Sequence, residues 1–148
     1  MKVSVQREDF DAGLEVKALS KDPKVGAVAS FVGVVREVPM TLEHYAGMTE
    51  REITKIAQEA MARWQVMDCT VIHRFGELRP TDQIVLVAVA SAHRGDAFAA
   101  CEFIMDYLKT RAPFWKKEQR PEGARWVEAR SSDDEAAGRW EPGAKKVG

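Results

Sequence analysis

The sequence predicts an α+β domain in which helices pack on a mainly antiparallel sheet. Three observations indicate this fold class. Residues 25–37, VGAVASFVGVVRE, are rich in β-branched side chains, which favour a strand. Residues 53–64 and 96–109 carry apolar side chains at helical spacing, as amphipathic helices lying on a sheet do. Strand-like segments interleave with these two helices, an order typical of α+β folds.

The first third of the chain predicts a strand, a helix and a long strand. Val3 and Val5 alternate as in a short strand, and residues 10–19 place apolar side chains at helical spacing. The long β-branched segment is apolar on both faces, so we expect it to be largely buried. Its glycines, Gly26 and Gly33, indicate bulges or a close approach of the backbone.

The middle third predicts a returning strand, a helix and a hairpin. Residues 40–45 form the strand, and Thr49 with Glu52 is a candidate capping box for the helix that follows. Residues 69–75 and 83–93 read as two strands. The turn-forming sequence GELRPTD joins them, so we expect an antiparallel pair.

The last third begins with the second amphipathic helix. Pro113 disfavours helix at the residue before it and therefore ends this helix. Two strands are expected at residues 112–119 and 124–131, and Ser132 is placed to cap a short final helix, DDEAAGRW. We expect residues 141–148 to be a loose tail.

Composition limits the classes of function. The chain has 148 residues, of which 45% are hydrophobic, enough for a single domain spanning residues 1–148. Its 22 Lys and Arg nearly cancel 23 Asp and Glu, so we expect neither nucleic acid nor an anionic membrane as a partner. Cys69 and Cys101 are far apart, which argues against a disulfide framework and a zinc site. A reducing cytoplasm is the expected location.

The most unusual local composition lies in residues 109–120, KTRAPFWKKEQR. This segment holds five basic residues and one acidic residue in a chain that is nearly neutral. It is a candidate anion site. The alternative is a solvated basic face, since lysines at a helix C-terminus also complement the helix dipole.

Other candidate residues lie at the ends of strands. His93 and Arg94 stand where a strand leads into the second helix, and a helix N-terminus attracts anions. Their structural alternative is a capping or core histidine at position 93 and a surface ion-pair residue at position 94. Arg36 ends the long apolar strand and projects past it. His44 and His73 lie inside strands without supporting residues, and we interpret both as structural.

Several chemistries find no support in the sequence. No GxSxG, P-loop, HExxH or GxGxxG pattern is present. Asp9, Asp11 and the acidic run 133–135 are interpreted as helix-start acids, so no metal site is expected. Two functions other than catalysis remain open. One is a non-catalytic module that binds a phosphorylated ligand or an acidic protein tail, and the other, weaker one is binding of single-stranded RNA through Trp115 and its lysines.

Longer segments resemble the large, catalytic subunit of molybdopterin synthases. These segments are FVGVVRE (31–37), TLEHYAGMTE (41–50), VIHRFGEL (71–78), IVLVAVASAHRGDAFAACEFIMDYLKTRAPFWKKE (84–118) and PEGARWVEAR (121–130). They span most of the chain in the family's order. The resemblance implies an α/β hammerhead-like domain with an additional antiparallel sheet. One departure is that only residues 37–41 follow Arg36 before LEHY, where the family usually has a longer loop.

The resemblance also implies a reaction and its partners. Such enzymes convert cyclic pyranopterin monophosphate to molybdopterin by adding two sulfurs. A small ubiquitin-like carrier subunit delivers them from the thiocarboxylate of its C-terminal Gly-Gly. The large subunit is a homodimer within a heterotetramer, and no permanently bound cofactor is implied.

The family's site residues match positions of this sequence. The matches for the catalytic residues are Lys109, Lys116 and Arg36. The matches for the substrate-binding residues are Val34, Val35, Arg36, His93, Arg94, Lys109, Lys116, Lys117 and Glu118. By resemblance, His93 and Arg94 are expected to reach into the pocket of the neighbouring subunit.

Overall fold

Two four-stranded sheets and their helices make up the computed structural model, which describes residues 1–127 and 131–141. The strands are β1 (Lys2–Gln6), β2 (Ala27–Val34), β3 (Met40–His44), β4 (Val66–Arg74), β5 (Gly76–Leu78), β6 (Gln83–Ser91), β7 (Phe114–Arg120) and β8 (Gly123–Val127). The helices are α1 (Ala12–Leu19), α2 (Met48–Arg63), α3 (Arg94–Thr110) and α4 (Ser131–Gly138). The predicted α+β class is confirmed.

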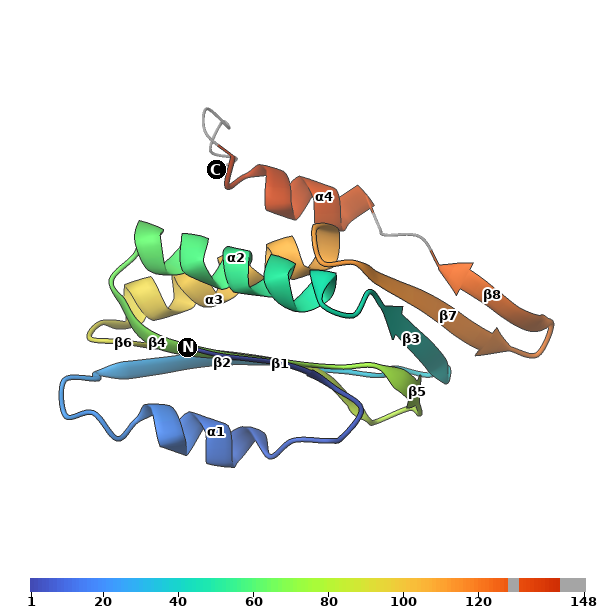
Figure 1. The fold of residues 1–148 in the computed structure, drawn as a ribbon, viewed down its shortest axis with the longest axis horizontal. Coiled ribbons are helices and arrows are strands. Elements are labelled where there is room, and N and C mark those ends of the chain that lie inside the picture. The colour runs from blue at the N-terminus through green and yellow to red at the C-terminus, as the bar shows by residue number, and fades with distance from the viewer. Residues whose placement is uncertain (128–130, 142–148) are drawn as a thin grey trace.

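The first sheet has the strand order β1-β4-β6-β2. β1 runs parallel to β4, whereas the β4–β6 and β6–β2 pairs are antiparallel, as predicted for β4 and β6. Helix α1 covers one face of this sheet, and α2 and α3 cover the other (Figure 1). The main core lies between the sheet and the α2–α3 pair, and a smaller core lies beneath α1.

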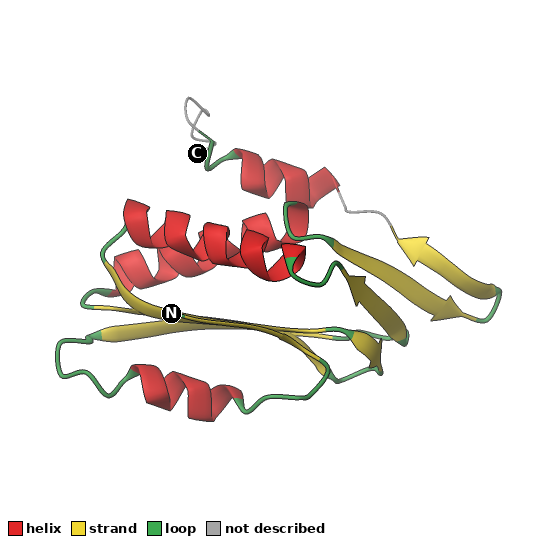
Figure 2. Cartoon of the chain, viewed as in Figure 1, coloured by secondary structure: helices red, strands yellow, loops and turns green. Residues whose placement is uncertain are grey.

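The second sheet is antiparallel and has the order β5-β3-β7-β8. It extends from one end of the first sheet, beyond the ends of α2 and α3 (Figure 2). The strand predicted at residues 40–45 is confirmed as β3, but it does not return along β2. It pairs instead with β5 and β7 in this second sheet. The additional antiparallel sheet expected from the resemblance is thus present.

The long β-branched strand is less buried than predicted. β2 lies at the edge of the first sheet, so Phe31 and Val34 remain 42% and 50% exposed. The predicted irregularities are confirmed, since the β2–β6 register shifts between Gly33 and Val34. A Cβ atom on Gly26 would lie 2.1 Å from the Ala92 carbonyl oxygen, so only glycine fits there.

Helix α2 begins earlier than the predicted capping box. Its N-cap is Gly47, whose N–H donates to the Glu50 carboxylate at 2.7 Å. Thr49 is buried instead, and its hydroxyl donates to the Pro113 carbonyl at 3.3 Å. The Thr49–Glu52 capping box is therefore wrong, because the Thr49 hydroxyl links the start of α2 to the segment after α3. The apolar stripe predicted for α2 is confirmed by the burial of its inward residues, Ile53, Ile56, Ala57 and Ala60.

The C-terminal helix α4 is fastened to α3. The predicted final helix is confirmed, but it runs from Ser131 to Gly138, two residues earlier at each end than predicted. Ser132 therefore lies inside the helix, and its prediction as the cap is wrong. The Asp106 carboxylate accepts hydrogen bonds from Arg139 at 2.8 Å and from the Trp140 indole at 2.7 Å. The Tyr107 hydroxyl donates to Glu141 at 2.6 Å, so the predicted loose tail does not begin at residue 141. Residues 142–148 of that tail lie outside the described part of the chain.

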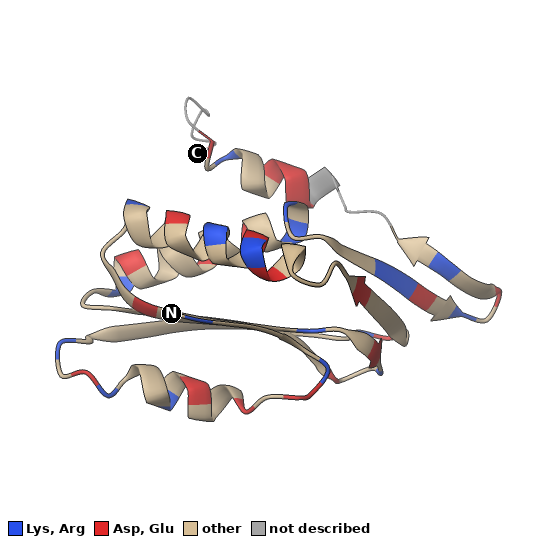
Figure 3. Cartoon of the chain, in the orientation of Figure 1, with Lys and Arg blue, Asp and Glu red and all other residues tan. Residues whose placement is uncertain are grey.

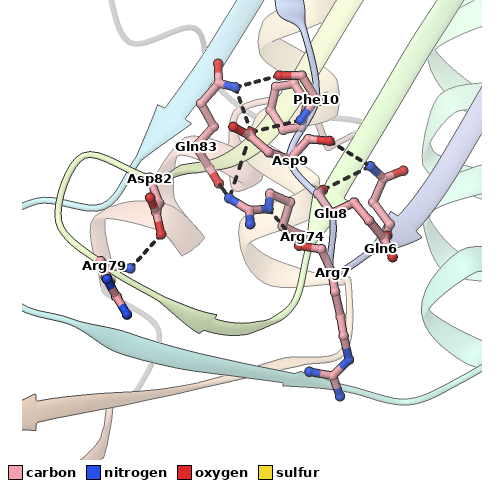
Figure 4. Close-up of polar contacts among 9 residues, drawn as sticks. All are labelled: Gln6, Arg7, Glu8, Asp9, Phe10, Arg74, Arg79, Asp82 and Gln83. Carbon is pink, nitrogen blue, oxygen red and sulfur yellow. Dashed lines mark hydrogen bonds and ion pairs between the residues drawn. The ribbon is translucent and has the colours of Figure 1, made fainter.

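Arg74 ties the ends of three strands together (Figure 4). Its Nε donates to the Arg7 carbonyl and its Nη1 to the Gln83 carbonyl, each at 3.0 Å. The Gln83 amide donates in turn to the Asp9 carboxylate at 2.9 Å. Asp9 thus anchors β6 rather than starting α1, whose N-cap is Asp11. This network fixes the end of β4 and therefore the position of His73, the residue before Arg74.

Candidate active site

A cleft of about 570 Å³ lies where the end of β2, the last turn of α3 and strand β7 meet. Its lining includes six of the residues predicted for the site, Val34, Val35, Arg36, Lys109, Lys116 and Glu118. Sequence positions about 70 residues apart thus come together, because the second sheet places β7 beside the turn after β2.

Arg36 lies in a tight turn directly after β2. Buried Val35 anchors this turn, because its N–H donates to the Asp82 carbonyl and its carbonyl accepts from Thr81, both at 2.9 Å. The Val38 N–H donates back to the Arg36 carbonyl at 2.8 Å, and Glu37 adopts a φ of 69°. The exposed Arg36 side chain is therefore held at the rim of the cleft by a constrained backbone.

Lys109 lies in the last turn of α3, where a cation complements the helix dipole. The neighbouring Met105 and Leu108 are buried and fix the helix against the core, while Lys109 itself is exposed toward the cleft. Among the described residues, neither Lys109 nor Arg36 forms a salt bridge. Their positive charges are therefore available to a bound anion.

Strand β7 supplies further charged side chains to the cleft, because its alternate residues face the same side. Phe114, Lys116, Glu118 and Arg120 line the cleft, as alternate residues of a strand share one face. Figure 3 shows basic bands on either side of an acidic one along this strand. Lys117 lies on the other face, with its ammonium 5.6 Å from the centre of the Trp126 ring. The structure therefore places Lys117 outside the cleft lining.

Glu118 is the acidic residue between the β7 cations. Its carboxylate lies 3.2 Å from the Lys116 ammonium and 2.6 Å from the Arg120 guanidinium. Burial acts to raise the pKa of Glu118, but the hydrogen bonds from Arg120 and Lys116 outweigh it and lower the pKa. Glu118 is accordingly ionised near neutral pH and holds the two cations in place.

His73 lines the cleft as well, although the sequence suggested only a structural role. Its ring stacks on Phe114 with centroids 3.7 Å apart, and its Nδ1 lies 2.9 Å from the Arg74 carbonyl oxygen. A carbonyl only accepts, so Nδ1 carries the proton and Nε2 keeps a lone pair. Burial lowers the pKa of His73 from 6.5 to about 4; the bond to Arg74 opposes this shift, and the Lys109 charge adds to it.

His93 and Arg94 lie far from the cleft of their own chain. His93 is the N-cap of α3 and Arg94 its first residue, whereas Lys109 belongs to the last turn. Both side chains are exposed, and neither forms a hydrogen bond or salt bridge within residues 1–127 and 131–141. They are therefore accessible to another molecule.

The cleft has the composition of an anion-binding site with several fixed cations. Arg36, Lys109, Lys116 and Arg120 surround it, and Glu37, Glu118 and Asp133 are the acids in its lining. Preorganised cations stabilise negative charge that develops during a reaction. The described residues contain no group of three or more His, Cys, Asp or Glu side chains placed to hold a metal ion. None of the helices in the described part of the chain is long and apolar enough to span a membrane.

Comparison with known families matches residues 5–111 to the MoaE protein family. The chain belongs to the MoaE protein family. The molybdopterin synthase catalytic subunit of Ralstonia nicotianae is 60% identical over 146 residues, covering 93% of this chain and 83% of that protein. The corresponding subunit of Escherichia coli is 53% identical and covers 94% of this chain and 97% of that protein.

Solved MoaE structures have the same fold. The molybdopterin biosynthesis MoaE protein of Burkholderia ambifaria superposes with a TM-score of 0.83 at 58% identity, covering 95% of this chain and 98% of that one. Membership of the MoaE family confirms the resemblance on which the site residues were predicted. The matched segment includes β2, α3 and Lys109, and ends before β7.

Arg120 and Phe114 line the cleft and belong to the candidate anion segment 109–120, but neither was predicted individually as a site residue. Both share the period of two with Lys116 and Glu118, so a strand assignment for β7 already contained the signal. His73 offered no such signal, because its place beside α3 and β7 depends on how the two sheets meet.

Proposed function

We propose that this MoaE family member is the catalytic subunit of a molybdopterin synthase. It converts cyclic pyranopterin monophosphate to molybdopterin by adding two sulfurs. The observation that carries this proposal is the cleft, because the cationic side chains of Arg36, Lys109 and Lys116 all belong to its lining. Substrate phosphate, the thiocarboxylate sulfur donor and the oxygen released when the cyclic phosphate opens are all anionic, so fixed cations favour each stage.

The sulfur donor is the C-terminal thiocarboxylate of a small ubiquitin-like partner that ends in Gly-Gly. Such a tail is slim enough to enter a narrow cleft, because glycines carry no side chain. Lys109 contacts the thiocarboxylate or its acyl intermediate. Lys116 and Arg36 orient phosphate and pterin at the same site, and Val34 and Val35 provide the apolar wall next to them.

The complete site requires a second copy of this chain. His93 and Arg94 are exposed at the far end of α3, and in a homodimer they reach the partner's cleft and bind substrate there. Two small subunits complete a heterotetramer, which works in the cytoplasm. Lys117, on the outer face of β7, contributes positive charge near the site without touching the cleft lining.

The deciding experiment is incubation of this chain with the pterin precursor and a thiocarboxylated small subunit, followed by detection of the dithiolene product. Lys109→Ala is expected to lower the rate at least about 100-fold, because it removes a cation that stabilises developing charge. Its free energy of unfolding should change by less than about 0.5 kcal/mol, since Lys109 is exposed and forms no salt bridge with the described residues.

Other outcomes would favour a different function. Binding of the phosphorylated precursor without any sulfur transfer would indicate a non-catalytic ligand-binding module instead. Near-normal turnover by Lys109→Ala would remove Lys109 from its catalytic role. Collapse of the fold in this variant would have the same consequence, and thermal melting measured beside activity separates the two cases.

A further inference from the structure

The carboxylate of Glu118 is divided between two cations. Arg120 donates through Nε and Nη2 to the same oxygen, Oε2, at 2.9 and 2.6 Å. Lys116 lies 3.2 Å from the other oxygen, Oε1. The arginine therefore makes the shorter and doubled contact, and the lysine makes a single longer one.

The backbone of β7 fixes this arrangement. Arg120 is the last residue of the strand and pairs with Gly123 across the hairpin, where Gly123 has a φ of 118°. Glu118 pairs with Met40, the first residue of β3 after the Arg36 turn. Because residues two apart on a strand share a face, the Arg120 side chain folds back onto Glu118 from the hairpin end.

The exposures of the Glu118 and Lys116 side chains differ in a way that matters for binding. Glu118 is only 14% exposed, whereas Lys116 is 40% exposed. An ammonium has three N–H donors, and a single contact with Oε1 leaves two of them. Lys116 can therefore donate to a ligand in the cleft while Glu118 still holds it.

We propose that Arg120 is a positioning residue that keeps Lys116 available to the phosphate group of a bound ligand. By occupying Oε2, the guanidinium prevents Glu118 from turning both oxygens to the lysine. Without Arg120, the carboxylate pairs fully with Lys116 and neutralises its charge. The role in turnover rests on the proposed function, but the role in anion binding does not.

Calorimetric titration with inorganic phosphate at low ionic strength tests the binding role. Arg120→Gln is expected to weaken phosphate binding roughly five- to tenfold, the equivalent of about one charge-assisted hydrogen bond. Lys17→Gln is the charge-matched control, because Lys17 is exposed on α1, which covers the opposite face of the first sheet. This control should bind phosphate as the wild type does. A loss in Arg120→Gln no larger than that in the control would overturn the proposal.

Two double variants distinguish positioning from direct contact. In a Lys116→Gln background, Arg120→Gln should change phosphate affinity less than about twofold, because the lysine it positions is gone. Adding Glu118→Gln to Arg120→Gln should recover most of the lost affinity, since no carboxylate then competes for Lys116. If the loss is equal in both lysine backgrounds, or no affinity is recovered, Arg120 acts on the ligand by itself and the proposal is wrong.

Steady-state kinetics separate this inference from the proposed function. With the pterin precursor and thiocarboxylated partner, Arg120→Gln should raise KM for the precursor and leave kcat within about twofold, as expected when ground-state binding is lost. The KM of Arg120→Lys should fall between those of the wild type and Arg120→Gln. Phosphate binding with the predicted coupling but no product in the wild type would refute the synthase function alone. Normal turnover with an unchanged KM in Arg120→Gln would refute the positioning role alone.

Discussion

His93 and Lys109 mark opposite ends of the same helix, α3. His93 is its N-cap and Lys109 lies in its last turn. At a rise of 1.5 Å per residue, the difference of 16 positions between them corresponds to about 24 Å along the helix axis. One chain therefore cannot bring both side chains to the same small ligand, and a site that uses both must contain two chains.

Mixing two variants, each expected to be inactive, tests whether the proposed homodimer builds each site from both chains. Lys109→Ala removes the cleft lysine, and Arg94→Ala removes the arginine next to His93. A heterodimer of the two has one cleft that lacks both residues and one that is intact. We expect random exchange to restore about a quarter of wild-type activity, because half of the dimers are mixed and each has one good site of two.

Control mixtures make this result decisive. Lys109→Ala mixed with Lys109→Ala/Arg94→Ala should stay inactive, because every cleft in that mixture lacks its lysine. Subunit exchange is verified independently with a tagged chain and mass spectrometry. Exchange without any recovery of activity would mean that each cleft works with residues of one chain.

The elements of the fold were largely predictable because their signals are local. The stripe of α2 and the β-branched composition of β2, β4 and β6 are properties of adjacent residues, and the structure confirms them. The errors came from long-range contacts. β2 lies at a sheet edge, which composition does not reveal, and Thr49 bonds to Pro113, 64 positions away, instead of capping its own helix.

The candidate site was predicted mainly by family resemblance. Arg36, Lys109, Lys116 and Glu118 line one cleft because the second sheet carries β7 to the end of β2. No periodicity in the sequence predicts that β7 lies beside the end of β2. His73 was missed for the same reason, since its burial against Phe114 joins β4 to β7 across the two sheets.

Gly26 is predicted to be intolerant of any side chain. A Cβ atom there would meet the Ala92 carbonyl oxygen at 2.1 Å, and the Gly26 N–H already donates to the Ser91 carbonyl at 3.0 Å. Gly26→Ala should therefore lower the free energy of unfolding by more than about 2 kcal/mol, since strand β2 must move away from the β6 end. Urea denaturation measures this change.

Gly95→Ala is the matched control for that substitution. A Cβ atom on Gly95 would meet nothing within 4 Å, and the residue lies in the first turn of α3. Alanine is the better helix former, so this variant should gain up to about 1 kcal/mol. Equal stability changes in the two variants would show that the approach of Gly26 to Ala92 is not tight.

His73 is expected to make stability depend on pH. Its pKa is about 4 in the folded protein against 6.5 for the ordinary side chain. Between these two pH values the imidazole of His73 is protonated in the unfolded chain but neutral in the folded chain. The free energy of unfolding therefore falls as the pH drops from 6.5 toward 4. The loss of unfolding free energy should reach roughly 1–3 kcal/mol. It is limited to this range because the imidazole is partly open to the cleft.

His73→Asn isolates this contribution. The amide of asparagine can still donate to the Arg74 carbonyl, but it does not titrate. The difference in unfolding free energy between wild type and variant should therefore shift in favour of the variant as the pH falls from 6.5 to 4. A constant difference across this range for His73→Asn would contradict a buried neutral imidazole.

The last prediction concerns the tail of the proposed small subunit. Under the proposed function, we expect the Lys109 and Lys116 ammonium groups, which line the cleft, to meet the terminal anion of that tail. We expect a surface of the partner's folded body to provide most of the binding energy. Removing the partner's last two glycines should eliminate sulfur transfer but weaken association only about tenfold or less. The electrostatic part of the binding free energy should shrink as salt rises.

Lys116→Glu should reduce both pterin binding and tail insertion, because it places a negative charge beside Glu118. Lys17→Glu makes the same change of charge on α1 and should leave both intact. Calorimetric titration with full-length and truncated partner decides the matter, and equal affinity together with equal activity for the two forms would rule out insertion of the tail.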